Sequence, residues 1–135
     1  MILVRRTLVC DLVQNVEGKY NLFGLFDAIN VQPPFPAQLP PFYMFASLYS
    51  TEPNELKFGE TRLTIEMSDA KGIAIIGPFG GALPGEKGQG VPPGSSLDCV
   101  IQVQGAKVPE AGDYRVVVKV DGNEMSDFRV RVRQM

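Results

Sequence analysis

The stretch GDYRVVVKVDGNEMSDFRVRVR, residues 112–133, decides the fold expected for this chain. Both halves of the stretch alternate apolar and polar side chains, as a β-strand with one buried and one exposed face requires. Asp121-Gly122-Asn123 lies between the two runs and has the composition of a tight hairpin turn. The stretch therefore predicts two antiparallel strands, near residues 113–121 and 125–133, joined by that turn.

Outside this hairpin, apolar and polar residues also alternate along most of the chain. No stretch of similar length has the 3.6-residue period of an amphipathic helix. Turn-forming residues such as Glu17-Gly18 separate the runs. Strands are expected near residues 2–13, 19–32, 42–50, 60–68, 73–77, 96–104, 113–121 and 125–133. The sequence thus predicts an all-β fold, an antiparallel β-sandwich of about seven to eight strands with immunoglobulin-like or jelly-roll topology.

Two segments interrupt the alternation. Residues 32–41 carry five prolines, which cannot donate to a strand ladder, so we expect a stiff link that takes the chain from one sheet to the other. Phe35 and Leu39 are expected to hold this link against the edge of the core. Residues 77–95 are rich in glycine and proline, and connections of this length are usually functional or disordered. The sequence leaves open whether this loop is ordered.

Composition limits the possible functions. The 135 residues suit a single domain, residues 1–135, and 44% hydrophobic with 21% charged residues is ordinary for a globular chain. The net charge of −2 lacks the basic surplus of a dedicated DNA-binding domain. There is no histidine, so the usual Ser-His and Cys-His nucleophile pairs are impossible and the commonest zinc ligand sets are missing. We therefore expect no catalytic, cofactor-binding or metal-ligating residues, and no enzyme activity.

The two cysteines and the N-terminal sequence bear on location. Cys10 and Cys99 fall inside apolar runs, so both are expected to be buried, and their mutual contact stays open. Arg5 and Arg6 interrupt the first apolar run, unlike in a secretory signal, and no run reaches the length of a membrane-spanning helix. A cytoplasmic protein is the expectation.

The stretch CDLVQNVEGKYNLFGLFD, residues 10–27, resembles the opening of a family of short, stand-alone, uncharacterised bacterial proteins. Members have an aspartate after a first strand, here Asp11, and then a G-K-x-N-x-x-G-x-F-D block, here residues 18–27. A Pro-rich link, a P-x-x-G-x-Y strand (residues 109–114) and a D-G hairpin follow in the same order. The resemblance implies a β-sandwich domain of unknown function and supplies no site residues. Tyr114 also resembles the tyrosine corner of immunoglobulin-like sandwiches, in which the phenol bonds to nearby backbone.

A protein-interaction or assembly module is the function that we expect. The run from Phe42 to Tyr49 is apolar on both faces, which indicates either a fully covered strand or an exposed interaction face. The partner is another protein or a second copy of the chain. The candidate interaction surface, on this run and the 77–95 loop, consists of Tyr43, Phe45, Tyr49, Phe79, Leu83 and Lys87. The alternative is a small-ligand module that holds a carbohydrate or a metal ion in its loops.

A nucleic-acid partner is the less favoured interpretation of the arginines. Arg129, Arg131 and Arg133 fall on one face of the last predicted strand, where Arg5, Arg6 or Arg115 would extend them into a basic patch. A solvated face that protects an edge strand from aggregation explains the same pattern more simply. No aromatic residues alternate with these arginines, as stacking on single strands would need.

Overall fold

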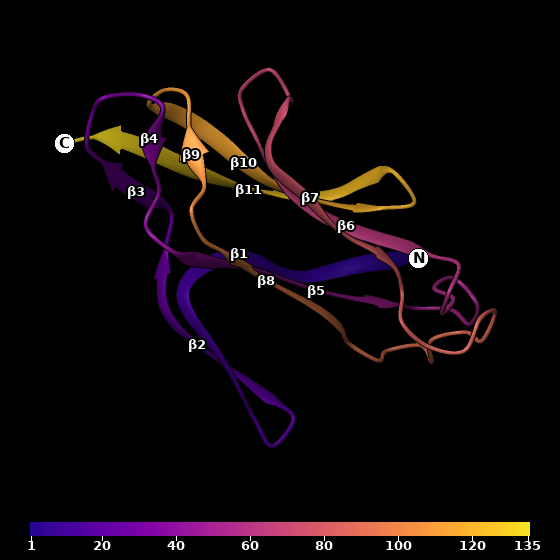
Figure 1. Cartoon of the computed structure of the whole chain (residues 1–135). Helices are drawn as coiled ribbons and strands as arrows, with labels where there is room; N and C mark the ends of the chain where they lie inside the picture. Colours follow the sequence, from indigo (N-terminus) through magenta and orange to yellow (C-terminus); the bar gives the residue numbers. More distant parts are fainter.

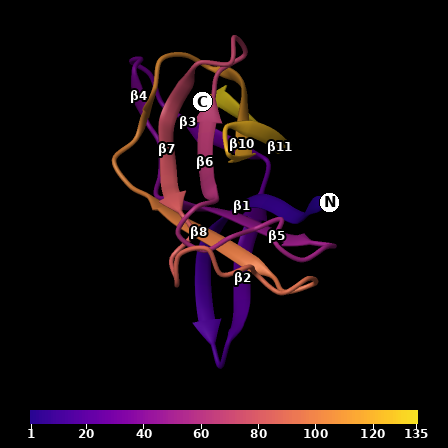
Figure 2. The ribbon, with the colours of Figure 1, turned by 90° about the vertical axis from the view of Figure 1, so that its right-hand side faces the viewer.

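The computed structural model describes residues 1–135, and its eleven strands form two packed sheets and a small ribbon (Figure 1). The first sheet has the order β2 (Lys19–Phe26), β1 (Ile2–Val16), β5 (Phe42–Ser50), β8 (Leu97–Val103). The second has the order β3 (Ala28–Val31), β11 (Asn123–Gln134), β10 (Gly112–Val120), β6 (Arg62–Ser68), β7 (Ala74–Ala82). The ribbon pairs β4 (Ala37–Gln38) with β9 (Lys107–Val108). The view of Figure 2 shows the two sheets as separate layers, which confirms the predicted sandwich.

The β10–β11 hairpin forms as its alternation predicts. Val120 pairs with Asn123, and the turn between them places Asp121 and Gly122 at φ of 50° and 82°. Two successive residues with positive φ form a two-residue hairpin turn, whose backbone twist matches the twist of the strands on either side. β6, β10 and β11 then lie side by side in the C-F-G order of an immunoglobulin-like sandwich.

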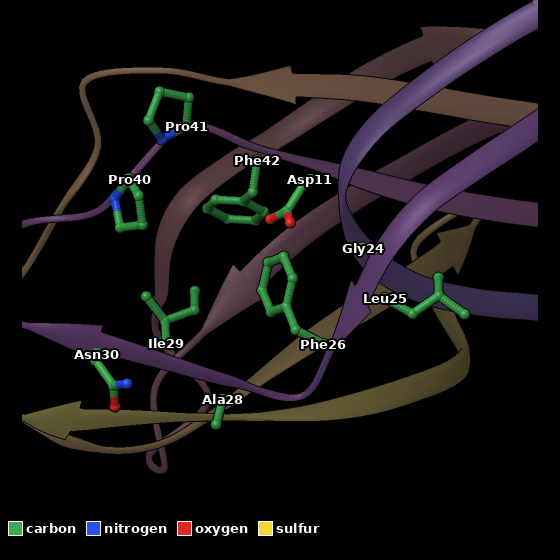
Figure 3. A pocket seen from close by; sticks show the side chains of 10 residues that line it. All are labelled: Asp11, Gly24, Leu25, Phe26, Ala28, Ile29, Asn30, Pro40, Pro41 and Phe42. Atoms are coloured by element: carbon green, nitrogen blue, oxygen red, sulfur yellow. The ribbon is translucent and has the colours of Figure 1, made fainter.

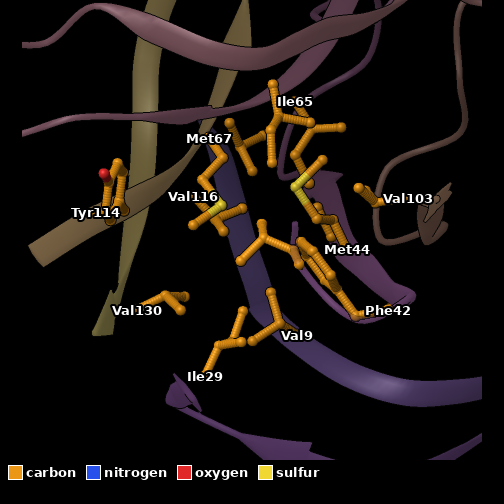
Figure 4. Packing of buried hydrophobic residues seen from close by; sticks show 14 of the residues in the cluster. Val9, Ile29, Phe42, Met44, Ile65, Met67, Val103, Tyr114, Val116 and Val130 are labelled. Carbon is orange, nitrogen blue, oxygen red and sulfur yellow. The ribbon is translucent and has the colours of Figure 1, made fainter. Parts of the chain in front are cut away.

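The core lies between the sheets and is built from the inward positions of both (Figure 4). Val9 and Met44 come from the first sheet, and Ile65 and Val116 from the second. Each of these side chains is fully buried. The phenol of Tyr114 donates a hydrogen bond of 2.6 Å to the carbonyl oxygen of Glu110, which confirms the tyrosine corner.

The structure has more strands than the seven to eight expected. The run expected at 19–32 divides into β2 and β3, because the chain leaves the first sheet at Asp27 and joins the second at Ala28. β4 and β9 are two-residue strands that pair across a large sequence separation, and runs so short carry no alternation. The Pro-rich link crosses between the sheets as expected, with Leu39 buried and Phe35 packed on the core.

The 77–95 segment is not a structureless loop. Its first part, Gly77 to Ala82, continues β7 along β6. The remainder exchanges backbone hydrogen bonds with residues 50–61: Gly59 donates to Leu83, Val91 to Leu56 and Gly94 to Ser50. The two loops thus form backbone hydrogen bonds with each other, so their N–H and C=O groups are paired although neither loop belongs to a sheet.

Candidate functional site

The β1–β2 hairpin projects from the body of the sandwich (Figures 1 and 2). β1 pairs with β5 only as far as Cys10, opposite Tyr43. Beyond that point its single neighbour is β2, which pairs from Val9–Phe26 to Val16–Lys19. Residues 11–24 are therefore a two-stranded ribbon with no third strand beside it.

The two faces of this ribbon differ in exposure. On one face Val13, Tyr20 and Leu22 are half-buried, and the Tyr20 ring meets the ring of Phe45 edge-on at 5.5 Å. The opposite face is apolar and exposed, and Leu12 pairs directly with Phe23 there. We call its four large apolar residues the hairpin face: Leu12 (39% exposed), Val16 (50%), Phe23 (49%) and Leu25 (63%). They make up four of the seven large apolar side chains that the chain exposes.

The base of the ribbon holds a close contact between Asp11 and Gly24. Gly24 has φ of +68°, and a Cβ atom on it would lie 2.2 Å from Oδ2 of Asp11. The two residues border a hollow of about 250 Å³ next to Phe26 and Phe42, whose rings meet edge-on at 6.0 Å (Figure 3). Figure 3 shows the Asp11 carboxylate beside the Phe42 ring. Glycine at position 24 leaves room for that carboxylate.

The aromatic residues expected on β5 are largely covered. Phe45 is only 4% exposed because Tyr20 of the hairpin packs against it. The Arg5 guanidinium lies over the Tyr49 ring, 4.2 Å from its centroid. Tyr43 is half-buried. The second apolar face of this strand is thus covered mainly within the chain, and Phe45 offers no free surface.

The loop residues of the expected surface lie elsewhere. Leu83 is buried in the core, so its side chain belongs to no surface. Phe79 is half-buried on β7, and Lys87 is exposed in the loop that follows. Since β5 and β7 belong to different sheets, the structure does not bring the six expected residues together.

Sequence reasoning missed the hairpin face. The signal was present, because residues 20–26 are apolar at both odd and even positions, as in the run from Phe42 to Tyr49. In such a run, apolar residues occupy both faces of the strand, so the sequence pattern does not show which of the two faces is covered in the folded chain.

The chemistry-bearing side chains are dispersed. No group of three or more histidine, cysteine, aspartate or glutamate side chains is placed to hold a metal ion. No helix that could cross a bilayer is present. Both cysteines are free thiols, Cys10 buried and Cys99 half-buried rather than buried as expected, and burial raises the pKa of each.

The arginines of β11 share one hollow. Arg129, Arg131 and Arg133 line a depression of about 290 Å³ together with Asp27. Nε of Arg131 donates to Oδ1 of Asp113 at 3.0 Å, whereas Arg129 and Arg133 form no ion pair. The expected clustering of these three residues on one face is therefore confirmed.

Comparison with known proteins identifies a family and a fold. The model of a family of unknown function (DUF6941) matches residues 5–133. No curated protein matches the sequence. A similar solved structure is the alkylpurine DNA glycosylase AlkC of Pseudomonas fluorescens, bound to DNA containing an abasic site analog, with a TM-score of 0.56 and 12% identity. The match covers 98% of this chain and 30% of the glycosylase, so the chain spans less than a third of that protein's length.

A second similar structure is an immunoglobulin-like protein from Pseudomonas aeruginosa. Its TM-score is 0.43 at 15% identity, and the match covers 98% of this chain and 97% of the other. At such low identities, the glycosylase likeness concerns the fold alone.

Proposed function

Because the chain belongs to DUF6941, a family of unknown function, its family brings no activity with it, and we propose a cytoplasmic, non-enzymatic assembly module. It associates with a second copy of itself through the hairpin face. The single observation that carries this proposal is the exposed apolar surface of Leu12, Val16, Phe23 and Leu25 on a projecting ribbon. The two free thiols suit a reducing compartment.

Self-association is favoured by the position and chemistry of the hairpin face. The element stands away from the sandwich, so two hairpins can stack face to face without contact between the two bodies. Gln14 and Asn21, at the middle of this face, are uncharged and pair with each other, and the charged residue of the face, Lys19, lies at its end opposite Val16. No like charges therefore oppose each other at the centre of such a contact.

The size of the hairpin face predicts a weak dimer. Four side chains that are 39–63% exposed offer on the order of 300 Å² per copy, less than half of the ~800 Å² per partner in a standard interface. Association that buries so little surface is reversible and depends on concentration. We expect monomer at low concentration and dimer at high concentration.

Sedimentation velocity across a concentration series, from about 5 µM to about 1 mM, tests this proposal. The wild-type protein is expected to shift from monomer to dimer, and the Phe23→Ser, Leu25→Ser double variant to stay monomeric with unchanged thermal stability. Ile73→Ser is the matched control, because Ile73 is 60% exposed but lies outside the hairpin. A wild-type monomer throughout the series, or equal loss of dimer in the Ile73 control, would overturn the proposal.

The alternative of a small-ligand module has one observation in its favour. The hollow at the base of the hairpin combines the Asp11 carboxylate and the Asn30 amide with the rings of Phe26 and Phe42. Carboxylate and amide groups beside aromatic rings suit a carbohydrate. A thermal-shift panel of sugars tests it: stabilisation that Asp11→Ala abolishes supports the alternative, and no shift with any sugar eliminates it.

A further inference from the structure

Both sheets leave a strand edge open on the same flank of the sandwich. Ile2–Leu8 of β1 pairs with β5 on one side, but β2 covers the other side only from Val9 onward. In the second sheet, β3 covers β11 only at Arg131–Gln134. The two edges face each other, and the hydroxyls of Thr7 and Ser126 are 2.8 Å apart between them.

A groove runs along the open edge of β1. Its volume is about 630 Å³. The apolar part of its wall comes from Leu8, Val9, Leu25, Phe26 and Phe128. Arg5, Arg6 and Thr7 of the same edge line it as well, and Asp27 lies where β2 ends. The groove thus combines unpaired backbone groups, apolar side chains and arginines.

Unpaired N–H and C=O groups along a strand are a template on which another extended chain can pair. We infer that Ile2–Leu8 of β1 takes up an extended peptide of another protein, in which apolar and acidic residues alternate, as an added strand of the first sheet. The peptide continues the line of β2, antiparallel to β1, in the place that the chain leaves when it turns at Asp27 into the second sheet.

The charges on this edge select the occupant. Arg6 is exposed and forms no ion pair, so it is free to pair with an acidic side chain. Arg5 lies beside it, over Tyr49, and donates to the carbonyl oxygen of Gly94. Asp27 disfavours an acidic residue at the end of the peptide that approaches β2.

The same charges disfavour a second copy at this edge. Two antiparallel copies of Ile2–Leu8, paired about their middle, would bring the Arg5-Arg6 pair of one beside that of the other. Like charges placed opposite each other destabilise a strand pair. The occupant is therefore a different protein, although the site borders the hairpin face and shares Leu25 with it.

An NMR titration of the whole protein tests this inference. The probe is a capped heptapeptide of alternating valine and glutamate, and its alternating valine and lysine counterpart is the control peptide. The glutamate peptide is expected to shift the amide signals of residues 2–8 and of Phe128, and the lysine peptide to bind at least about fivefold more weakly. Shifts confined to β7 or β8, or no shifts at millimolar peptide, would overturn the inference.

Variants separate the role of Arg6 from a general effect of charge. Arg6→Glu is expected to reverse the preference, so that the lysine peptide binds more tightly than the glutamate peptide. Lys71→Glu makes the same charge change in an exposed turn and is expected to leave the preference unchanged. Equal effects of the two variants would contradict a specific site at this edge. Because Leu25 belongs to both surfaces, the single variant Phe23→Ser, outside the groove wall, tests the dimer, and Arg6→Glu, outside the hairpin face, tests the groove. Failure of one proposal is thus distinguishable from failure of the other.

Discussion

Replacing Gly24 by alanine is expected to destabilise the folded chain by about 2 kcal/mol, and about half of this cost depends on Asp11. Gly24 has a φ of +68°, in the left-handed region that alanine avoids at a cost of about 1 kcal/mol. The new Cβ would also lie 2.2 Å from Oδ2 of Asp11, so the aspartate has to leave its rotamer. Because that side chain is exposed, the rearrangement costs only about 1 kcal/mol.

Urea unfolding of a double-mutant cycle measures both parts. Asp11→Ala alone is expected to change the free energy of unfolding by less than ~0.5 kcal/mol, because the carboxylate forms no hydrogen bond or ion pair. In the Asp11→Ala background, Gly24→Ala is expected to cost about 1 kcal/mol, which leaves a coupling energy of about 1 kcal/mol. Hydrogen exchange of the Lys19–Phe26 amides detects any loss that stays confined to the hairpin.

Gly72→Ala is the matched control for the backbone cost. Gly72 has a φ of +82°, and a Cβ atom on it would meet nothing within 4 Å. The effect of the substitution on the unfolded chain is the same at both sites and cancels in the comparison. The reasoning is refuted if Gly24→Ala costs no more than Gly72→Ala, or if its cost is equal with and without the Asp11 carboxylate.

Two further predictions concern the core and the thiols. Tyr114→Phe removes the 2.6 Å hydrogen bond to Glu110 and is expected to lower the free energy of unfolding by about 1 kcal/mol. Thermal unfolding should show this as a Tm lower by a few degrees, and an unchanged Tm would contradict a stabilising role of the tyrosine corner. Because burial raises the pKa of Cys10 and Cys99, less thiolate is present at pH 7.5, and iodoacetamide is expected to alkylate both more slowly than a free thiol and faster as the pH rises. Mass spectrometry should find Cys99 modified before Cys10, since only Cys10 is fully buried, and the reverse order would contradict the burial seen here.

The candidate site was only partly predictable. Phe45 and Leu83 were expected to belong to an interaction surface, because they are apolar residues in a two-faced strand and a glycine-rich loop. Phe45 is instead covered by Tyr20, which is 25 positions earlier in the sequence, and Leu83 by the core. The local sequence pattern does not show which side chains a distant element covers. For the same reason it did not show that Phe23 and Leu25 of the hairpin stay exposed.

The fold was more accessible, because the features that specify it are local. The alternation at Tyr114, Val116 and Val118, with the Asp121-Gly122 turn, is enough to predict two paired strands, since side chains two apart share a face. Their register depends in addition on a shift between Val118 and Lys119, after which Val118 pairs with Ser126. The Pro-rich link also indicated a crossing between sheets by its chemistry alone. Strands as short as β4 and β9 carry no such pattern and appear only once their partners are in place.

By itself, then, the sequence of this chain determined its all-β class, its main strands and its hairpins, because these depend on neighbouring residues. Only the tertiary structure decided which strand edges stay open and which faces stay exposed. Asp27 turns the chain out of the first sheet, which leaves Ile2–Leu8 without a neighbour on the side opposite β5. The pairing of β1 with β5 ends at Cys10, which leaves the β1–β2 ribbon without a third strand. Open edges and uncovered faces depend on which distant segments pair, and pairing across the sheets is a property of the whole fold.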